Sequence, residues 1–145
     1  MAFGYVTYKN FAPVNLIASN LTNSEGCGLK LDAEGAVSLA VTTGSLPYAI
    51  LAVGCDSITP GTYPSAPVAG SLEVIDQLGV AVQVRASSAG SIAAGDYIMI
   101  DATDADGSFV ADNTPASTKF VWGIALTDCS AGEQFILRFA PFIAA

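Results

Sequence analysis

The chain has 145 residues, of which 52% are hydrophobic and 12% are charged. This length is typical of one domain built around a single core. Since ordinary globular domains are roughly 25% charged, little charge is left here to cover the outside. We therefore expect part of the exposed surface to be apolar or weakly polar and to be covered by a partner, as in an oligomer or a lattice.

The charge balance excludes several kinds of partner. Thirteen acidic and five basic residues give a net charge of −8, which repels nucleic-acid phosphates and anionic lipid headgroups. The longest apolar candidate, PYAILAVGC at residues 47–55, is half of the roughly 18–20 residues that a membrane helix needs. The first residues, MAFGYVTYKNFAPV, show neither a basic leader nor a cleavage site. We expect a protein that folds in the cytoplasm and binds neither nucleic acid nor membrane.

Apolar and polar residues alternate with a period of two, which is typical of half-buried β-strands. The clearest cases are residues 36–42, 79–85 and 133–140. Their predicted inward side chains are Val37, Leu39 and Val41, then Val80, Val82 and Val84, then Phe135, Leu137 and Phe139. Runs rich in β-branched and aromatic residues predict further strands, at residues 3–9, 48–53, 71–76, 97–101 and 119–127.

Fourteen glycines and seven prolines lie mostly between these runs, where they favour turns. Residues 59–70 contain three prolines, which cannot donate ladder hydrogen bonds, so a long surface loop is predicted there. The sequence predicts a single-domain all-β fold, a β-barrel or a β-sandwich with long Pro/Gly-rich loops. Residues 1–45 are expected to form an N-terminal arm and the first strands of this domain, with a docking role open to the arm, and residues 46–145 its barrel or sandwich core.

The three cysteines are Cys27, Cys55 and Cys129, which form no CxxC pair, and the chain has no histidine. This spacing is not that of a zinc site. Free, buried thiols are expected, because a reducing compartment disfavours the one disulfide that three cysteines could form.

A cluster of aspartates follows the predicted strand at 97–101, at Asp101, Asp104, Asp106 and Asp112. An EF-hand calcium loop needs oxygen ligands at positions 1 and 12, where this segment has Ala102 and Asn113. Asp106-Gly107 lies between the apolar runs YIMI and FV, and Asp-Gly is a strong signal for a hairpin connection. A turn is the favoured interpretation, and calcium binding by the same loop stays open.

No set of residues predicts catalysis or a bound cofactor. Triads of the usual kind need a histidine, and the chain has none. The acidic residues are spread through turns, whereas paired-carboxylate catalysis needs two of them side by side in a cleft. Neither phosphate-binding motif, GxxxxGK[ST] or GxGxxG, occurs. We expect no enzyme activity and no catalytic, cofactor-binding or metal-binding residues.

Both ends of the chain are rich in aromatic and apolar residues. Chain ends are usually polar unless something holds them, and aromatic side chains supply large contact areas. One interpretation makes these ends docking segments for a neighbouring subunit, and the other makes them the first and last strands of the domain's own core. The candidate interface residues are Phe3, Tyr5, Tyr8, Phe11, Phe139, Phe142 and Ile143. Trp122 is expected in the core.

Two segments are similar to each other: SAGSIAAGDYIMID at residues 88–101 and CSAGEQFILRF at residues 129–139. Each places a small-residue turn with Ala-Gly and an acidic residue before an apolar strand. A duplicated hairpin and independent convergence on the same turn chemistry both account for this pattern.

The C-terminal part of the chain carries a more specific pattern of turns and strands. It consists of Gly95-Asp96 before an apolar strand, Asp101, Asp106-Gly107, the strand Gly123-Ile124-Ala125-Leu126, the turn Ala131-Gly132-Glu133 and the ending Leu137-Arg138-Phe139. This pattern resembles the carboxy-terminal half of capsid decoration proteins, or cement proteins, of tailed phages. The resemblance covers roughly residues 46–140, and the first 45 residues match no pattern of that family.

The resemblance implies an all-β barrel or sandwich that assembles as a homotrimer. It implies binding to the major capsid protein on the outer surface of an icosahedral head, in virions formed in the host cytoplasm, where the decoration protein stabilises the shell. Attachment in many copies would allow modest contacts to suffice. The alternatives are another structural β module, such as a phage fibre or tail piece or a surface adhesin, and a carbohydrate-binding β-sandwich.

Overall fold

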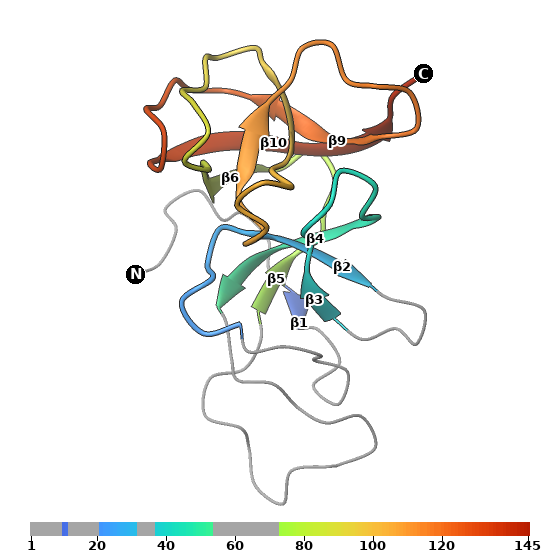
Figure 1. Ribbon diagram of the computed structural model, residues 1–145. Coiled ribbons are helices and arrows are strands. Elements are labelled where there is room, and N and C mark those ends of the chain that lie inside the picture. The colour runs from blue at the N-terminus through green and yellow to red at the C-terminus, as the bar shows by residue number, and fades with distance from the viewer. Residues whose placement is uncertain (1–9, 12–20, 32–36, 54–72) are drawn as a thin grey trace, which may run out of the picture.

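The computed structural model describes residues 10–11, 21–31, 37–53 and 73–145. These residues form ten strands in two antiparallel sheets and no helix, so the predicted all-β class is confirmed. Figure 1 shows the two sheets as successive layers, the first five strands in one and the last five in the other. The predicted strand at 3–9 and the predicted loop at 59–70 lie outside the described residues.

The N-terminal sheet has the strand order β1-β5-β4-β2-β3. Its strands are β1 (Asn10–Phe11), β2 (Gly28–Leu31), β3 (Val37–Leu39), β4 (Pro47–Val53) and β5 (Glu73–Ile75). Three of these were predicted at nearly these positions, but β2 was not, because it begins inside a cluster of turn residues. It pairs with both β3 and β4, so strands on the two sides of residue 45 belong to one sheet.

The C-terminal sheet has the order β6-β10-β9-β7-β8. Its strands are β6 (Ala81–Arg85), β7 (Tyr97–Ile100), β8 (Phe109–Ala111), β9 (Phe120–Ala125) and β10 (Gln134–Ile143). The two edges of the sheet meet at one point, where Ala86, just after β6, bridges Phe109 of β8. The Ser87 N–H also donates to the Phe109 carbonyl oxygen at 2.8 Å. The sheet is therefore strongly curved, but its described strands do not close into a barrel.

The predicted alternation is seen most clearly in β6 and β10. Val82 and Val84 of β6 are fully buried, and so, to within 2%, are Phe135, Leu137 and Phe139 of β10. The residues between them are half-buried or exposed. Because a strand turns successive side chains to opposite faces, one face of this sheet forms the core and the other faces outward.

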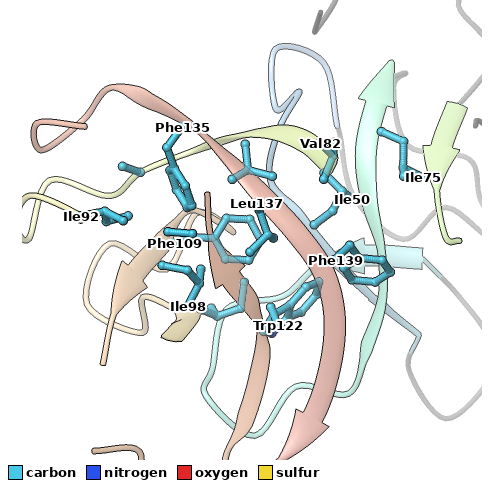
Figure 2. Packing of buried hydrophobic residues seen from close by; sticks show 14 of the residues in the cluster. Ile50, Ile75, Val82, Ile92, Ile98, Phe109, Trp122, Phe135, Leu137 and Phe139 are labelled. Carbon is cyan, nitrogen blue, oxygen red and sulfur yellow. The ribbon is translucent and has the colours of Figure 1, made fainter. Parts of the chain in front are cut away.

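One hydrophobic cluster joins the two sheets. Ile50 and Ile75 reach it from the N-terminal sheet, and Trp122 lies within it fully buried, as predicted. The Trp122 ring meets Phe109 edge-on with centroids 5.4 Å apart, and Phe139 at 6.2 Å. Figure 2 shows these rings together, with Ile50 and Ile75 approaching from the other layer. Face-to-face packing over a shared core is the arrangement of a β-sandwich.

The segment Gly26-Cys27-Gly28 connects strands of both sheets through its backbone. The Gly26 N–H donates to the Leu51 carbonyl of β4 at 2.8 Å, and the Leu51 N–H donates to the Cys27 carbonyl at 2.9 Å. The Gly26 carbonyl accepts from the N–H of Arg85, at the end of β6, at 3.0 Å. All three residues of the segment are buried, so each unmade hydrogen bond would leave a buried polar group unpaired.

The two layers approach each other closely at Gly28. A Cβ added to Gly28 would lie 2.8 Å from Cδ1 of Ile100 and 2.9 Å from Cη2 of Trp122, both in the C-terminal sheet. The Gly28 N–H donates to the carbonyl of Gly107, in the β7–β8 loop, at 2.8 Å. Gly107 has a φ of +82°, and its own Cβ would lie 3.0 Å from that of Cys27. Two glycines therefore permit the contact between the sheets.

Strand β10 continues past the predicted end at residue 140 and through Pro141 to Ile143. Its pairing with β9 shifts register between Phe139 and Phe142. A bulge is one of the few places where a sheet accepts proline. Opposite the bulge, Gly123 has a φ of +154°, and an added Cβ would lie 1.9 Å from the Arg138 carbonyl oxygen.

We predict that Gly28→Ala lowers the free energy of unfolding by about 2 kcal/mol, because the new methyl group must displace the packed Trp122 ring. Gly44→Ala is the matched control, since a Cβ at Gly44 meets nothing within 4 Å. Urea unfolding followed by Trp122 fluorescence measures both. Equal stability of the two variants would show that the close approach of the sheets tolerates a side chain.

Candidate interaction surface

The N-terminal candidate residues lie mostly outside the described part of the chain. Phe3, Tyr5 and Tyr8 are not among the described residues. Phe11 is the second residue of β1 and pairs with Glu73 of β5, at the edge of the N-terminal sheet. The structure therefore describes the strand that follows residues 1–9. The docking role of Phe3, Tyr5 and Tyr8 remains a prediction.

The C-terminal candidates separate into core and surface. Phe139 is 1% exposed and packs against Trp122 in the shared core, so its ring is not available to a partner of this chain. Phe142 and Ile143 are 44% and 56% exposed. The bulge in β10 lies between Phe139, which belongs to the core, and Phe142, which lies at the surface.

The structure places further exposed apolar side chains on the same sheet as Phe142. The rings of Tyr97 and Phe142 meet edge-to-face with centroids 5.8 Å apart. Tyr97 pairs with Ile124 across β7 and β9, and Leu126 lies two residues further along the chain from Ile124. All four are between 37% and 44% exposed. We call Tyr97, Ile124, Leu126 and Phe142 the outer-sheet patch.

Register shows that this patch faces away from the core. Ile124 pairs with Arg138, and the next pair along, Ala125 with Leu137, is buried in the shared core. Paired residues point to the same face, and successive residues point to opposite faces. Ile124 and Arg138 therefore lie together on the outer face. From sequence alone, Tyr97, Ile124 and Leu126 were not predicted to be interface residues, because their proximity depends on strand order and register.

Two arginines lie on this face: Arg138, and Arg85, which pairs with Gln134 on the same side of β10. Nη1 of Arg138 donates a long hydrogen bond of 3.4 Å to the Gly79 carbonyl oxygen, and Nη2 of Arg85 donates to the Asn23 carbonyl oxygen at 3.0 Å. The outer face thus combines exposed apolar side chains with positive charge, on a chain whose net charge is −8.

The aspartate cluster is used to shape loops. Gly107 has the positive φ that the Asp-Gly signal predicts, but the connection between β7 and β8 runs over residues 101–108 and is longer than a two-residue hairpin. Carboxylate oxygens accept backbone N–H groups two residues ahead: Asp101 from Thr103 at 2.8 Å, Asp106 from Ser108 at 3.0 Å and Asp112 from Thr114 at 2.9 Å. These are Asx-turns.

Asp104 connects this loop to a neighbouring one. Its two carboxylate oxygens accept the backbone N–H of Ser88 at 2.8 Å and the Ser88 hydroxyl at 2.9 Å. Oδ2 of Asp101 is buried without a hydrogen-bond partner. Among the described residues, no three His, Cys, Asp or Glu side chains converge in a way that could hold a metal ion. The geometry of the described carboxylates supports the turn interpretation.

The two similar segments form matching turns that lie next to each other. In the first, the Ala93 N–H donates to the Asp96 carboxylate at 2.9 Å, and in the second the Ser130 N–H donates to that of Glu133 at 3.2 Å. The glycine of each turn has a positive φ. Just before the turns, Ile92 and Cys129 form an antiparallel bridge, with N–H to carbonyl distances of 3.0 and 2.9 Å.

Cys27 is a free, buried thiol, as predicted, whereas Cys129 is free but only half-buried; Cys55 lies outside the described residues. Burial raises the pKa of Cys27 to about 12, although Arg85 acts against this shift. Burial also raises the pKa of Cys129. Both thiols are therefore protonated near neutral pH and are poor nucleophiles.

Hydrogen bonds lower the pKa of the Asp96 carboxyl group. The Asn113 side-chain amide donates to it at 2.8 Å and the Ala93 backbone N–H at 2.9 Å, and both hydrogen bonds lower its pKa. Asn113 also accepts the Tyr97 N–H at 2.9 Å. This network holds the β6–β7 connection against the end of β8, directly beside the outer-sheet patch.

Neither a scan of protein-family models nor a search of curated proteins finds a match for this chain. Over the described residues, the structure contains no helix with the length and apolar character that crossing a membrane requires.

We predict that Asn113→Ala raises the pKa of Asp96 toward its ordinary value, because the first hydrogen bond to the carboxylate is lost. The folded-state pKa lies below the unfolded value of about 3.9. The wild-type contribution to stability is therefore present above that pH and is lost as pH falls through the folded-state pKa. NMR titration of the Asp96 carboxyl carbon measures this, with Ser117→Ala as an exposed control. An unchanged titration curve in Asn113→Ala would contradict the assigned cause.

Proposed function

We propose that this protein is a structural component of a phage virion. It binds the outer surface of an icosahedral head as a decoration or cement protein and stabilises the shell. Its partners are the major capsid protein and further copies of itself in a homotrimer. The observation that carries the proposal is the outer-sheet patch, since four apolar side chains that lie 37–44% exposed on one sheet face are typical of a contact surface.

The composition supports the same function. The described carboxylates serve largely in loops, where they accept hydrogen bonds from turn N–H groups. The outer face of the C-terminal sheet is thereby left with little charge, apart from Arg85 and Arg138. A surface poor in charge and rich in exposed aromatic and aliphatic side chains is characteristic of protein contact surfaces.

The resemblance to decoration proteins concerns the architecture of the chain. Its matching residues include Gly95, Gly107 and Gly132, which have positive φ at turns. Gly123 also belongs to the pattern, and there a side chain would collide with the backbone of β10. Because these residues are needed for folding, the resemblance supports a shared architecture. The outer-sheet patch is the separate observation that supports binding to the head.

Mixing the purified protein with undecorated heads of the phage that encodes it tests the proposal. We expect the protein to cosediment with heads up to a saturating, stoichiometric occupancy and to raise the temperature at which the heads rupture. Multivalent attachment makes this occupancy steep in protein concentration. Absence of head binding, together with binding on a glycan array, would overturn the proposal in favour of a carbohydrate-binding module.

Deletion of residues 1–9 tests the aromatic arm while leaving β1 in place. We expect head binding to weaken at least tenfold and the melting temperature to change little, because Phe3, Tyr5 and Tyr8 are proposed to contact the partner. Removal of residues 1 and 2 alone is the control. Equal losses of stability and binding would assign the arm to the domain's own core.

A further inference from the structure

We propose that the outer-sheet patch is the surface that contacts the major capsid protein, and that its partner supplies an apolar strip with a carboxylate facing Arg138. The inference rests on the proposed function and assigns one of its contacts to particular residues. It makes the C-terminal sheet, and not only the chain ends, the part of the molecule that binds the shell.

The size of the patch argues for this occupant over a second copy. A fully exposed large side chain presents roughly 150–250 Å². The four residues of the patch are 37–44% exposed and therefore present roughly 240–390 Å² together. A stable protein–protein interface buries about 800 Å² on each partner, so the patch is too small to hold two copies together by itself.

A small contact is sufficient for stable attachment to the shell when each oligomer makes it several times. In the proposed homotrimer, three copies present three outer-sheet patches to three neighbouring shell subunits. Once one patch is bound, the others bind at high effective concentration, and overall affinity rises without any new kind of contact. The shell offers such a repeated target, whereas a single second copy does not. The contacts between copies are left to other surfaces.

Charge defines the partner further. Arg138 pairs with Ile124 across the sheet and is exposed beside the patch, and its contact with Gly79 is long and uncharged. Burying an unpaired guanidinium is costly, whereas an opposing carboxylate would form a charge-assisted hydrogen bond. The complementary surface therefore carries an acidic group beside apolar side chains.

The test uses the full-length chain, undecorated heads as the probe, and substitutions on and off the patch. Phe142→Ser and Ile124→Thr remove apolar surface from the patch, and Ile124→Thr keeps a β-branched residue suited to a strand. Leu78→Ser is the matched control, because Leu78 is 69% exposed and lies in the β5–β6 turn. Arg138→Glu is compared with Lys30→Glu, a charge reversal in the N-terminal sheet.

We expect Phe142→Ser and Ile124→Thr each to weaken head binding at least tenfold, with Leu78→Ser within twofold of wild type. Arg138→Glu should weaken binding more than Lys30→Glu, and its effect should diminish as salt concentration rises. Circular dichroism and thermal melting confirm that the compared variants are folded. Native mass spectrometry should find the same oligomeric state for all of them.

The outcomes separate this inference from the proposed function. If wild-type protein binds heads and the patch variants bind equally well, the inference is overturned and the function stands. If the patch variants change the oligomeric state, the occupant is a second copy and the inference is again overturned. If wild-type protein does not bind heads at all, the proposed function fails and the inference fails with it.

Discussion

The close approach of two glycines, Gly28 and Gly107, is the constraint on which the rest of this structure depends. A side chain at Gly28 would occupy the space of the Trp122 ring, and the hydrogen bond from Gly28 to Gly107 joins the two sheets directly. With Gly26 and Cys27, this point connects strands of both layers through buried backbone groups. If the sheets were held further apart, these backbone N–H and carbonyl groups would lose their hydrogen-bond partners, and the core would lose its close packing.

This geometry divides the C-terminal sheet between two tasks. Its inner face packs Phe135, Leu137 and Phe139 into the core, and its outer face exposes Ile124 beside Arg138. Along β9 and β10, residues adjacent in sequence thus serve stability and the proposed binding respectively. Past the register shift that follows Phe139, Phe142 is exposed, and its ring meets the Tyr97 ring edge-to-face.

The acidic residues have a structural role that complements this division. Asp101, Asp106 and Asp112 close Asx-turns, and Asp96 and Glu133 hold two matching turns on either side of the Ile92–Cys129 bridge. Carboxylates placed in turns keep the loops solvated and leave the strand faces apolar. The few charged residues are therefore concentrated in connections between strands, which leaves apolar side chains exposed on the outer sheet face.

The sequence by itself determined the all-β class, most strand positions, the inward residues of β6 and β10, the burial of Trp122 and the turn at Gly107, because these follow from local alternation and turn chemistry. The sequence did not predict β2, because its first residue, Gly28, is typical of a turn. Only the structure shows that a glycine is needed there to make room for the Trp122 ring. The order β6-β10-β9-β7-β8 and its register were decided only by the tertiary structure, since a period-two pattern does not specify which strands pair. Tyr97, Ile124 and Phe142 come together across that register, and for this reason the sequence pointed to the chain ends while the fold assembled the patch from three strands.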